Sequence, residues 1–120
     1  RVEKEVIIER EVDMDALPGM MHTVYFWLKP DLNEADEQAF LDGVRSLETV
    51  STVRNFFIGP PAGTESRDVV DNTFSYALII WFDNVEDHLA YQVDPIHLKF
   101  VEENKDKWER VRVRDNALME

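Results

Sequence analysis

The segment AYQVDPIHLKF, residues 90–100, carries a phenol and an imidazole at Tyr91 and His97. An imidazole titrates near neutral pH and can take a proton from an acidic carbon, whereas a phenol can stabilise a carbonyl oxygen on which negative charge develops. Together the two groups could transfer protons in a small organic molecule. On one straight helix, six positions would separate the side chains by about 120°. Asp94 and Pro95 interrupt the helix and remove that restriction.

Each candidate residue also has a structural interpretation. Tyr91 can be a core aromatic whose hydroxyl reaches solvent, and His97 can tie the helix junction together by a side-chain to backbone hydrogen bond. His22 opens an apolar strand face, where it is either a satisfied core histidine or a third polar group beside Tyr91 and His97. The residues alone leave both interpretations open.

Metal-ligand spacing is absent from the sequence. No two of the three histidines have H-x-H or H-x-x-x-H spacing, and His88 is predicted to lie on a charged helix face beside Asp87. The other two histidines and Asp94 could supply two imidazoles and a carboxylate, but we expect no metal, haem or other cofactor. The chain has no cysteine, which excludes thiolate nucleophiles and disulfides.

The elements that must position these residues follow from hydrophobic periodicity and capping signals. Strands are predicted over 22–29, 52–59, 74–82 and 108–114, and helices over 33–50, 83–92 and 95–107. This order is typical of an α+β fold, the ferredoxin-like split βαβ sandwich, with a four-stranded antiparallel sheet and helices on one face. Two of the strands are apolar on both faces, so we predict a homodimer in which a second copy covers the other face of the sheet.

Composition bounds the domain organisation and the partners. The 120 residues are enough for one domain, which we predict over 22–115, with an N-terminal extension over 1–21 and a C-terminal tail over 116–120. A formal charge of −12 argues against binding to nucleic acid or to anionic membranes. The longest apolar run, residues 76–82, is far shorter than the roughly 20 residues of a membrane span. We therefore predict a soluble, cytoplasmic protein.

Two motifs and a short final strand resemble a known family. The sequence MHTVYFWLK near the start of the domain and the Y-x-x-x-P-x-H-x-x-F run from Tyr91 to Phe100 are similar to the Dabb family, the stress-responsive dimeric α/β-barrel domain. The resemblance spans about residues 21–115. It implies small ferredoxin-like domains that dimerise through their sheets into an α/β barrel.

The resemblance also implies roles for particular residues. One family enzyme, the plant olivetolic acid cyclase, closes a linear polyketide by an aldol condensation without a cofactor. The matching residues imply that Tyr91 and His97 form a catalytic pair and that His22 lines the pocket. Asp94 stands where many family members have a histidine before the proline, so the charge at the pocket rim differs and the reaction stays open.

We therefore expect a homodimer that binds a small apolar or aromatic molecule in a pocket between sheet and helices. One alternative is a cofactor-independent cyclase, isomerase or monooxygenase with His97 as general base. Another is a structural, stress-protective dimer with a filled core. Besides Tyr91 and His97, the expected ligand contacts are His22, Val24, Phe26, Leu89 and Phe100.

Overall fold

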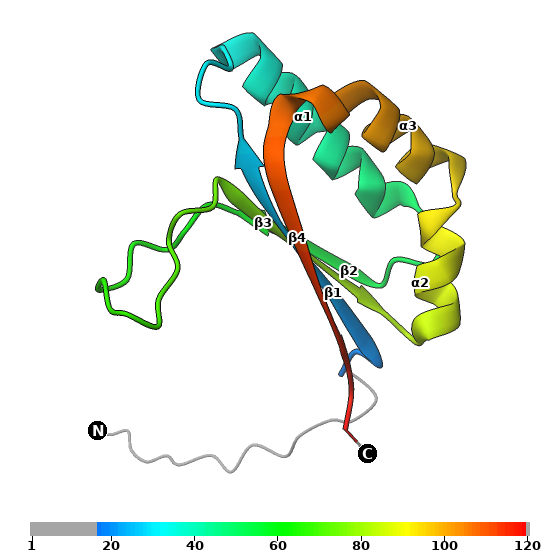
Figure 1. Ribbon diagram of the computed structural model, residues 1–120. Helices are drawn as coiled ribbons and strands as arrows, with labels where there is room; N and C mark the ends of the chain where they lie inside the picture. The colour runs from blue at the N-terminus through cyan, green and yellow to red at the C-terminus, as the bar shows by residue number, and fades with distance from the viewer. Residues whose placement is uncertain (1–16, 120) are drawn as a thin grey trace, which may run out of the picture.

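The protein folds as one layer of helices on one antiparallel sheet. The structure is a computed structural model that describes residues 17–119. The strands are β1 (Met20–Leu28), β2 (Asn55–Gly59), β3 (Tyr76–Phe82) and β4 (Trp108–Ala117). They pair in the order β2-β3-β1-β4, and the helices lie on one face of the sheet (Figure 1). The predicted ferredoxin-like α+β fold is confirmed.

The helices begin at capping residues that the sequence makes visible. The α-helices are α1 (Glu34–Ser46), α2 (Val85–Gln92) and α3 (Pro95–Asn104), and short 3₁₀ turns follow at η2 (Leu47–Thr49) and η3 (Lys105–Lys107). The side chains of Asn33, Asn84 and Asp94 each accept a hydrogen bond from a backbone N–H of the first turn. Pro95 occupies the first turn of α3, where a missing N–H costs nothing.

The outer ends of β1 and β4 extend beyond the predicted strands. β1 begins at Met20 and β4 ends at Ala117, and these two residues face each other in the β1–β4 register. The polar residues after Arg114 carry no strand signal, so only the pairing itself shows that the strand continues. Residues 1–16, most of the predicted extension, lie outside the described residues.

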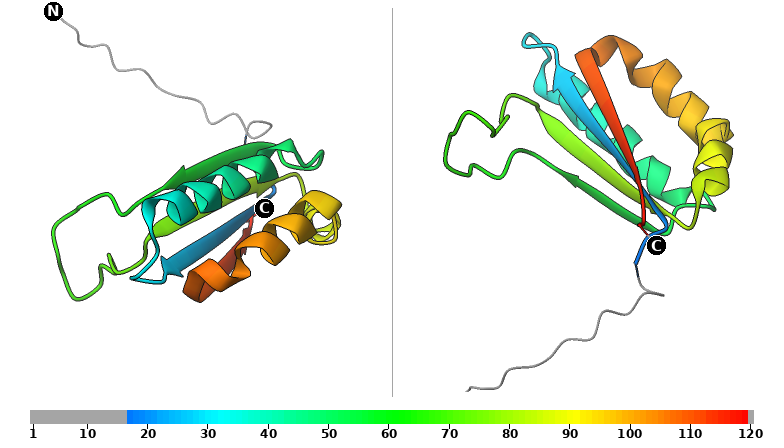
Figure 2. Two further views of the ribbon diagram at one scale, coloured as in Figure 1. Left: turned by 90° about the horizontal axis from the view of Figure 1, so that it is seen from above. Right: turned by 60° about the horizontal axis from the view of Figure 1, so that its bottom comes forward.

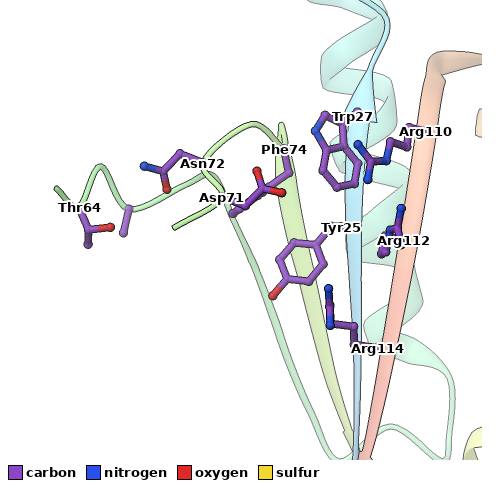
Figure 3. A pocket seen from close by; sticks show the side chains of 10 residues that line it. Tyr25, Trp27, Thr64, Asp71, Asn72, Phe74, Arg110, Arg112 and Arg114 are labelled. Atoms are coloured by element: carbon purple, nitrogen blue, oxygen red, sulfur yellow. The ribbon is translucent and has the colours of Figure 1, made fainter. Parts of the chain in front are cut away.

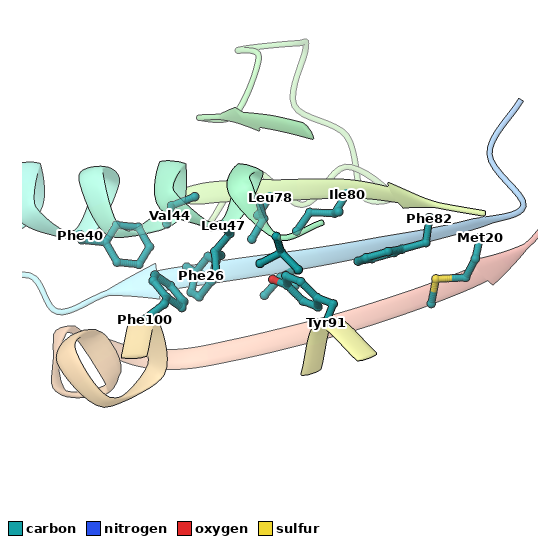
Figure 4. Close-up of a cluster of buried hydrophobic side chains, with 12 residues drawn as sticks. Met20, Phe26, Phe40, Val44, Leu47, Leu78, Ile80, Phe82, Tyr91 and Phe100 are labelled. Carbon is teal, nitrogen blue, oxygen red and sulfur yellow. The ribbon is translucent and has the colours of Figure 1, made fainter. Parts of the chain in front are cut away.

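Alternate residues of β1 and β3 face the helices and form the core. Phe26 packs edge-on against Phe40 of α1, with ring centroids 5.1 Å apart. Phe82 and Tyr91 extend the core toward the end of the sheet near α2 (Figure 4). The buried apolar residues of this core cluster are Met20, Val24, Phe26, Phe40, Val44, Leu47, Val50, Leu78, Ile80, Phe82, Tyr91 and Phe100.

The opposite face of the sheet has no helix over it, as Figure 1 and the right view of Figure 2 show. Many of the residues that alternate with the core positions of β1, β2 and β3 are large and apolar, whereas β4 contributes arginines, and we call this surface the open face. Its large apolar side chains are Met21, Tyr25, Trp27, Phe57, Ile79 and Trp81. Phe57 is 56% exposed. An apolar sheet face of this extent is the kind of surface that a partner covers.

The long connection between β2 and β3, residues 60–75, projects on the side opposite the helices (Figure 1). Hydrogen bonds fasten its last turns to β1. Trp27 Nε1 donates to Thr73 Oγ1 at 2.9 Å, and that hydroxyl donates to Asp71 Oδ1 at 2.6 Å. The backbone N–H of Leu28 donates to Ser75 Oγ at 2.9 Å. The connection therefore borders the open face.

Candidate functional site

Three elements bring the candidate residues together on the helix-facing side of the sheet. His22 comes from β1, Tyr91 from the last turn of α2, and His97 from the first turn of α3. The ring centroids of Tyr91 and His97 are 4.7 Å apart, and those of His22 and Tyr91 are 5.9 Å apart. The pair that one straight helix would separate is thus in contact across the helix junction.

Asp94 builds this junction. Its Oδ1 accepts a hydrogen bond from the Ile96 N–H at 2.8 Å, and its own N–H donates to the Tyr91 carbonyl at 3.1 Å. Asp94 is therefore the N-cap of α3, and this structural role accounts for an aspartate before Pro95, because aspartate is among the preferred N-cap residues. The turn ends α2 and starts α3 in a new direction.

His97 makes a side-chain to backbone hydrogen bond across the same junction. Its Nδ1 lies 3.0 Å from the Gln92 carbonyl oxygen, which only accepts, so Nδ1 carries the proton. The neutral ring then has its lone pair on Nε2. Burial lowers the pKa of His97 against the opposing effect of the Gln92 hydrogen bond, and repulsion from His22 lowers it further. At neutral pH the ring is therefore an uncharged base.

Tyr91 is 1% exposed, and burial raises the pKa of its phenol well above the ordinary value. The group therefore stays protonated and can donate a hydrogen bond. No residue from 17 to 119 accepts that bond or donates one to the hydroxyl oxygen, and the oxygen is not fully enclosed, because Thr52 Oγ1 is the one fully enclosed side-chain polar atom without a partner in this range. The ring packs against Phe82, with centroids 5.2 Å apart (Figure 4).

Two further residues of this cluster were missed by the sequence analysis. Asp115 lies opposite His22 in the β1–β4 register, and its Oδ1 is 2.6 Å from His22 Nδ1. His88 is 8% exposed and its ring centroid is 4.5 Å from that of His22, so its predicted place on a charged, solvated helix face is wrong. Burial, followed by repulsion from His22, lowers the pKa of His88.

Both missed residues had a periodicity signal. His88 precedes Tyr91 by one helical turn and therefore shares its face of α2. Asp115 continues the alternation of Val111 and Val113 along β4, which places all three on the helix-facing side. These two valines are 43% and 48% exposed, so the helices leave this part of β4 uncovered beside Asp115.

The remaining expected ligand contacts lie at different depths. Val24, Phe26 and Phe100 belong to the core and are at most 7% exposed, whereas Leu89 is 56% exposed on α2. A cavity of about 430 Å³ between α1 and α3 is lined in part by Phe100, and another of about 570 Å³ lies beside Tyr76. Neither is lined by the Tyr91–His97 pair. The ligand-contact roles stay predictions.

A third cavity, of about 520 Å³, lies on the open face between the sheet and residues 62–74 (Figure 3). Its lining combines aromatic rings with a row of arginines from β4, namely Tyr25, Trp27, Phe74, Arg110, Arg112 and Arg114. The Arg110 guanidinium lies 4.3 Å from the centroid of a Trp27 ring, a cation–π contact. The arginine row therefore borders an aromatic surface.

Within residues 17–119, no helix has both the length and the hydrophobicity needed to cross a bilayer. No curated protein matches the sequence. Solved structures share its fold at low identity. A hydroxynitrile lyase from Passiflora edulis is 22% identical, with a TM-score of 0.71 over 84% of this chain and 94% of the other.

Two bacterial structures are similar to the same extent. A Dabb family protein with a ferredoxin-like fold from Mesorhizobium loti is 21% identical, with a TM-score of 0.68 over 84% of this chain and 97% of that one. A dimeric ferredoxin-like protein of unknown function from Thermobifida fusca is 16% identical, with a TM-score of 0.69 over 84% and 92%. The sequence model of the Dabb family, described as the stress responsive A/B barrel domain, matches residues 20–117 of this chain. The chain therefore belongs to the Dabb family.

Proposed function

We propose that the protein is a homodimer in which each chain binds a small apolar or aromatic molecule against Tyr91, His97 and His22. The observation that carries this proposal is the Tyr91 hydroxyl, which makes no hydrogen bond within residues 17–119 although its side chain is only 1% exposed. The hydroxyl oxygen is not fully enclosed, because Thr52 Oγ1 is the one fully enclosed side-chain polar atom without a partner among these residues. A ligand oxygen that reaches it would give this hydroxyl a hydrogen-bond acceptor, which a phenylalanine could not use.

The flanking groups define the chemistry of the ligand. Tyr91 donates to a carbonyl or hydroxyl oxygen, and His97 Nε2 accepts from a neighbouring O–H or activated C–H. The uncovered Val111 and Val113 on β4 offer an apolar surface for the body of the molecule. An aromatic or aliphatic ketone combines these features.

The homodimer accounts for the open face. Its tryptophans and Ile79 have no helix over them, and an isologous partner would bury them against the same residues of a second copy. The Thermobifida fusca structure with the same fold is described as dimeric. Packing two such sheets face to face gives the barrel that the family name describes.

A second candidate function, a cofactor-independent enzyme, is favoured by the tautomer of His97. Its unprotonated Nε2 belongs to a ring that Gln92 holds through Nδ1 and whose centroid lies 4.7 Å from that of Tyr91. In such an enzyme Nε2 takes a proton from the carbon beside the substrate carbonyl, and the electron pair moves onto the carbonyl oxygen. The Tyr91 hydroxyl donates a hydrogen bond to that oxygen. A hydroxynitrile lyase has the same fold, so an enzyme with this architecture exists, which is consistent with the proposal.

Binding is tested with acetophenone as the probe, followed by chemical-shift changes in a two-dimensional amide spectrum. We expect changes at residues 88–97 and a loss of affinity of roughly threefold to tenfold in Tyr91→Phe, because one neutral hydrogen bond is worth about 0.5–1.5 kcal/mol. Tyr76→Phe is the matched control, since its hydroxyl bonds Glu37 instead. Shifts confined to the open face would refute the binding site.

The general-base role is tested by exchange of the acetophenone methyl protons in D₂O. We expect the protein to accelerate exchange beyond an equal concentration of imidazole, and His97→Ala to lose the acceleration. Equal rates in both proteins would remove His97 as the base while leaving the binding proposal intact.

The dimer is tested by sedimentation at micromolar concentration. The unchanged chain should sediment with the mass of two chains, and Trp81→Lys on the open face should sediment as one. Val69→Lys is the control, because Val69 is 80% exposed in the β2–β3 connection. A monomer mass for the unchanged chain would count decisively against the dimer.

A further inference from the structure

Three metal-ligating side chains meet beside the Tyr91–His97 pair. His22, His88 and Asp115 each offer one donor atom, and these atoms all lie within 4.8 Å of one another. The three residues come from β1, α2 and β4, so local sequence spacing cannot indicate the cluster. Two of the chain's three histidines are used.

The spacing of the donors suits a transition metal after a small adjustment. Metal–ligand bonds of about 2.0–2.1 Å in a tetrahedral site place donor atoms about 3.3 Å apart. The closest pair here, His22 Nδ1 and Asp115 Oδ1, is 2.6 Å apart, and the widest spacing is within 4.8 Å. The Asp115 side chain is 43% exposed and can rotate, while the 5% exposed His22 side chain is held by its surroundings.

Hydrogen bonding alone explains only part of the cluster. The His22–Asp115 contact is satisfied by one shared proton, and His88 Nε2 accepts a hydrogen bond from the Gln92 side-chain nitrogen at 2.9 Å. These bonds do not join His88 to His22, although the two ring centroids are 4.5 Å apart. A cation between the rings would join both imidazoles and the carboxylate, with His88 ligating through Nδ1 or through Nε2 in place of its Gln92 bond. Ligation through His22 Nδ1 uses the tautomer with the proton on Nε2, so the ring stays neutral.

We propose that His22, His88 and Asp115 form a binding site for a divalent transition-metal ion such as Zn²⁺. Two imidazole nitrogens and one carboxylate oxygen are the donors that Zn²⁺, Co²⁺ and Fe²⁺ accept, whereas Mg²⁺ and Ca²⁺ prefer oxygen alone. Three protein ligands leave at least one position for water or a substrate oxygen. The Tyr91–His97 pair lies next to the ion and is not among its ligands.

The site is tested on the full chain, without a polyhistidine tag and freed of metal with EDTA. Titration with Co²⁺ is followed by visible absorption, and titration with Zn²⁺ by calorimetry. We expect one ion per chain and the visible bands of a four- or five-coordinate Co²⁺ ion. Mg²⁺ should neither bind nor displace Co²⁺.

Variants assign the ligands. We expect His22→Ala, His88→Ala and Asp115→Asn each to weaken Zn²⁺ binding at least tenfold, and His97→Ala to bind as tightly as the unchanged chain. Asp115→Asn is the safest of these, because it keeps the side-chain shape at a half-exposed position and should preserve folding, which circular dichroism checks.

Absence of Zn²⁺ and Co²⁺ binding to the unchanged chain overturns the proposal, and so does binding that Asp115→Asn leaves intact. An equal loss in His97→Ala overturns the ligand assignment. The small-molecule site is judged separately, since it depends on Tyr91 and His97 and is probed by acetophenone.

Discussion

Replacing Tyr91 by phenylalanine should stabilise the fold while weakening the site. The side chain is 1% exposed, and its hydroxyl makes no hydrogen bond within residues 17–119. The hydroxyl oxygen is nearly but not fully enclosed, because Thr52 Oγ1 is the one fully enclosed side-chain polar atom without a partner within residues 17–119. Folding without a ligand therefore removes most of the water around the Tyr91 hydroxyl with no compensating bond, at a cost below the roughly 1–3 kcal/mol of a fully buried one. The phenyl ring keeps its contacts with Phe82 and His97, so no cavity forms.

We expect the free energy of unfolding to rise by up to about 1 kcal/mol in Tyr91→Phe, which is a melting-temperature increase of at most roughly 4 °C. Urea titrations of both proteins give the midpoint and the slope. Protein concentrations must be equal, because the stability of a dimer depends on them. An unchanged slope shows that the surface exposed on unfolding is the same.

Tyr76→Phe is the internal comparison. Its hydroxyl donates to Glu37 Oε2 at 2.7 Å, so its removal should lower stability by about 0.5–1.5 kcal/mol. Opposite signs for the two substitutions would show that the difference comes from hydrogen bonding rather than from the loss of an oxygen atom. A loss of stability in Tyr91→Phe would refute the reasoning, because the hydroxyl would then make a net favourable bond in the folded protein.

Three further substitutions test other parts of the framework. Gly43→Ala places a Cβ 2.7 Å from Asn104 Nδ2 and 3.2 Å from Phe100 Cδ1, so the clash between α1 and α3 should lower stability by about 1–3 kcal/mol in urea titrations; a gain would mean that the helices separate freely. Asp94→Ala removes the N-cap of α3 and should cost about 1 kcal/mol in thermal unfolding, whereas Asp94→Asn should retain most of the stability. Burial lowers the pKa of His97 in the folded protein, so as pH falls the unfolded chain binds a proton at His97 before the folded chain does. The contribution of the neutral His97 to stability is therefore fully present above about pH 6.5 and is lost as pH falls through the folded-state pKa. His97→Gln should therefore flatten the decline in urea midpoint below pH 6.5, and an unchanged decline would contradict the assignment.

The strands, the helices and the junction between α2 and α3 were predictable because each depends on residues that are close together in the sequence. Strand alternation, the three N-caps and Pro95 are each read within a few residues, and they place Tyr91 and His97 at a helix junction. The side-chain to backbone bond of His97 was an open alternative in the sequence, and the structure contains it. This hydrogen bond is compatible with both ligand binding and general-base catalysis by His97, because it uses Nδ1 and not Nε2.

The rest of the cluster depends on contacts between distant segments. His22 and Asp115 are 93 positions apart and meet only through the register of two paired strands. Periodicity gives the face of a residue but does not say which segment covers that face. The same limit applies to Arg110 of β4, whose contact with Trp27 joins two strands and cannot be inferred from either strand alone.

Tyr91 lies between the proposed metal site and the proposed small-molecule site, and the effect of Zn²⁺ on Tyr91→Phe shows whether its hydroxyl contacts the ion. The Tyr91 ring centroid lies 5.9 Å from that of His22 and 6.2 Å from that of His88, close enough for the hydroxyl to become a ligand if α2 rotates. If the ion takes only the two imidazoles and the Asp115 carboxylate, the hydroxyl stays without a partner, and Tyr91→Phe should be stabilising with Zn²⁺ as well as without it. If saturating Zn²⁺ abolishes the gain, the phenol donates to the ion or to its bound water, and the metal would then belong to the ligand site itself rather than beside it.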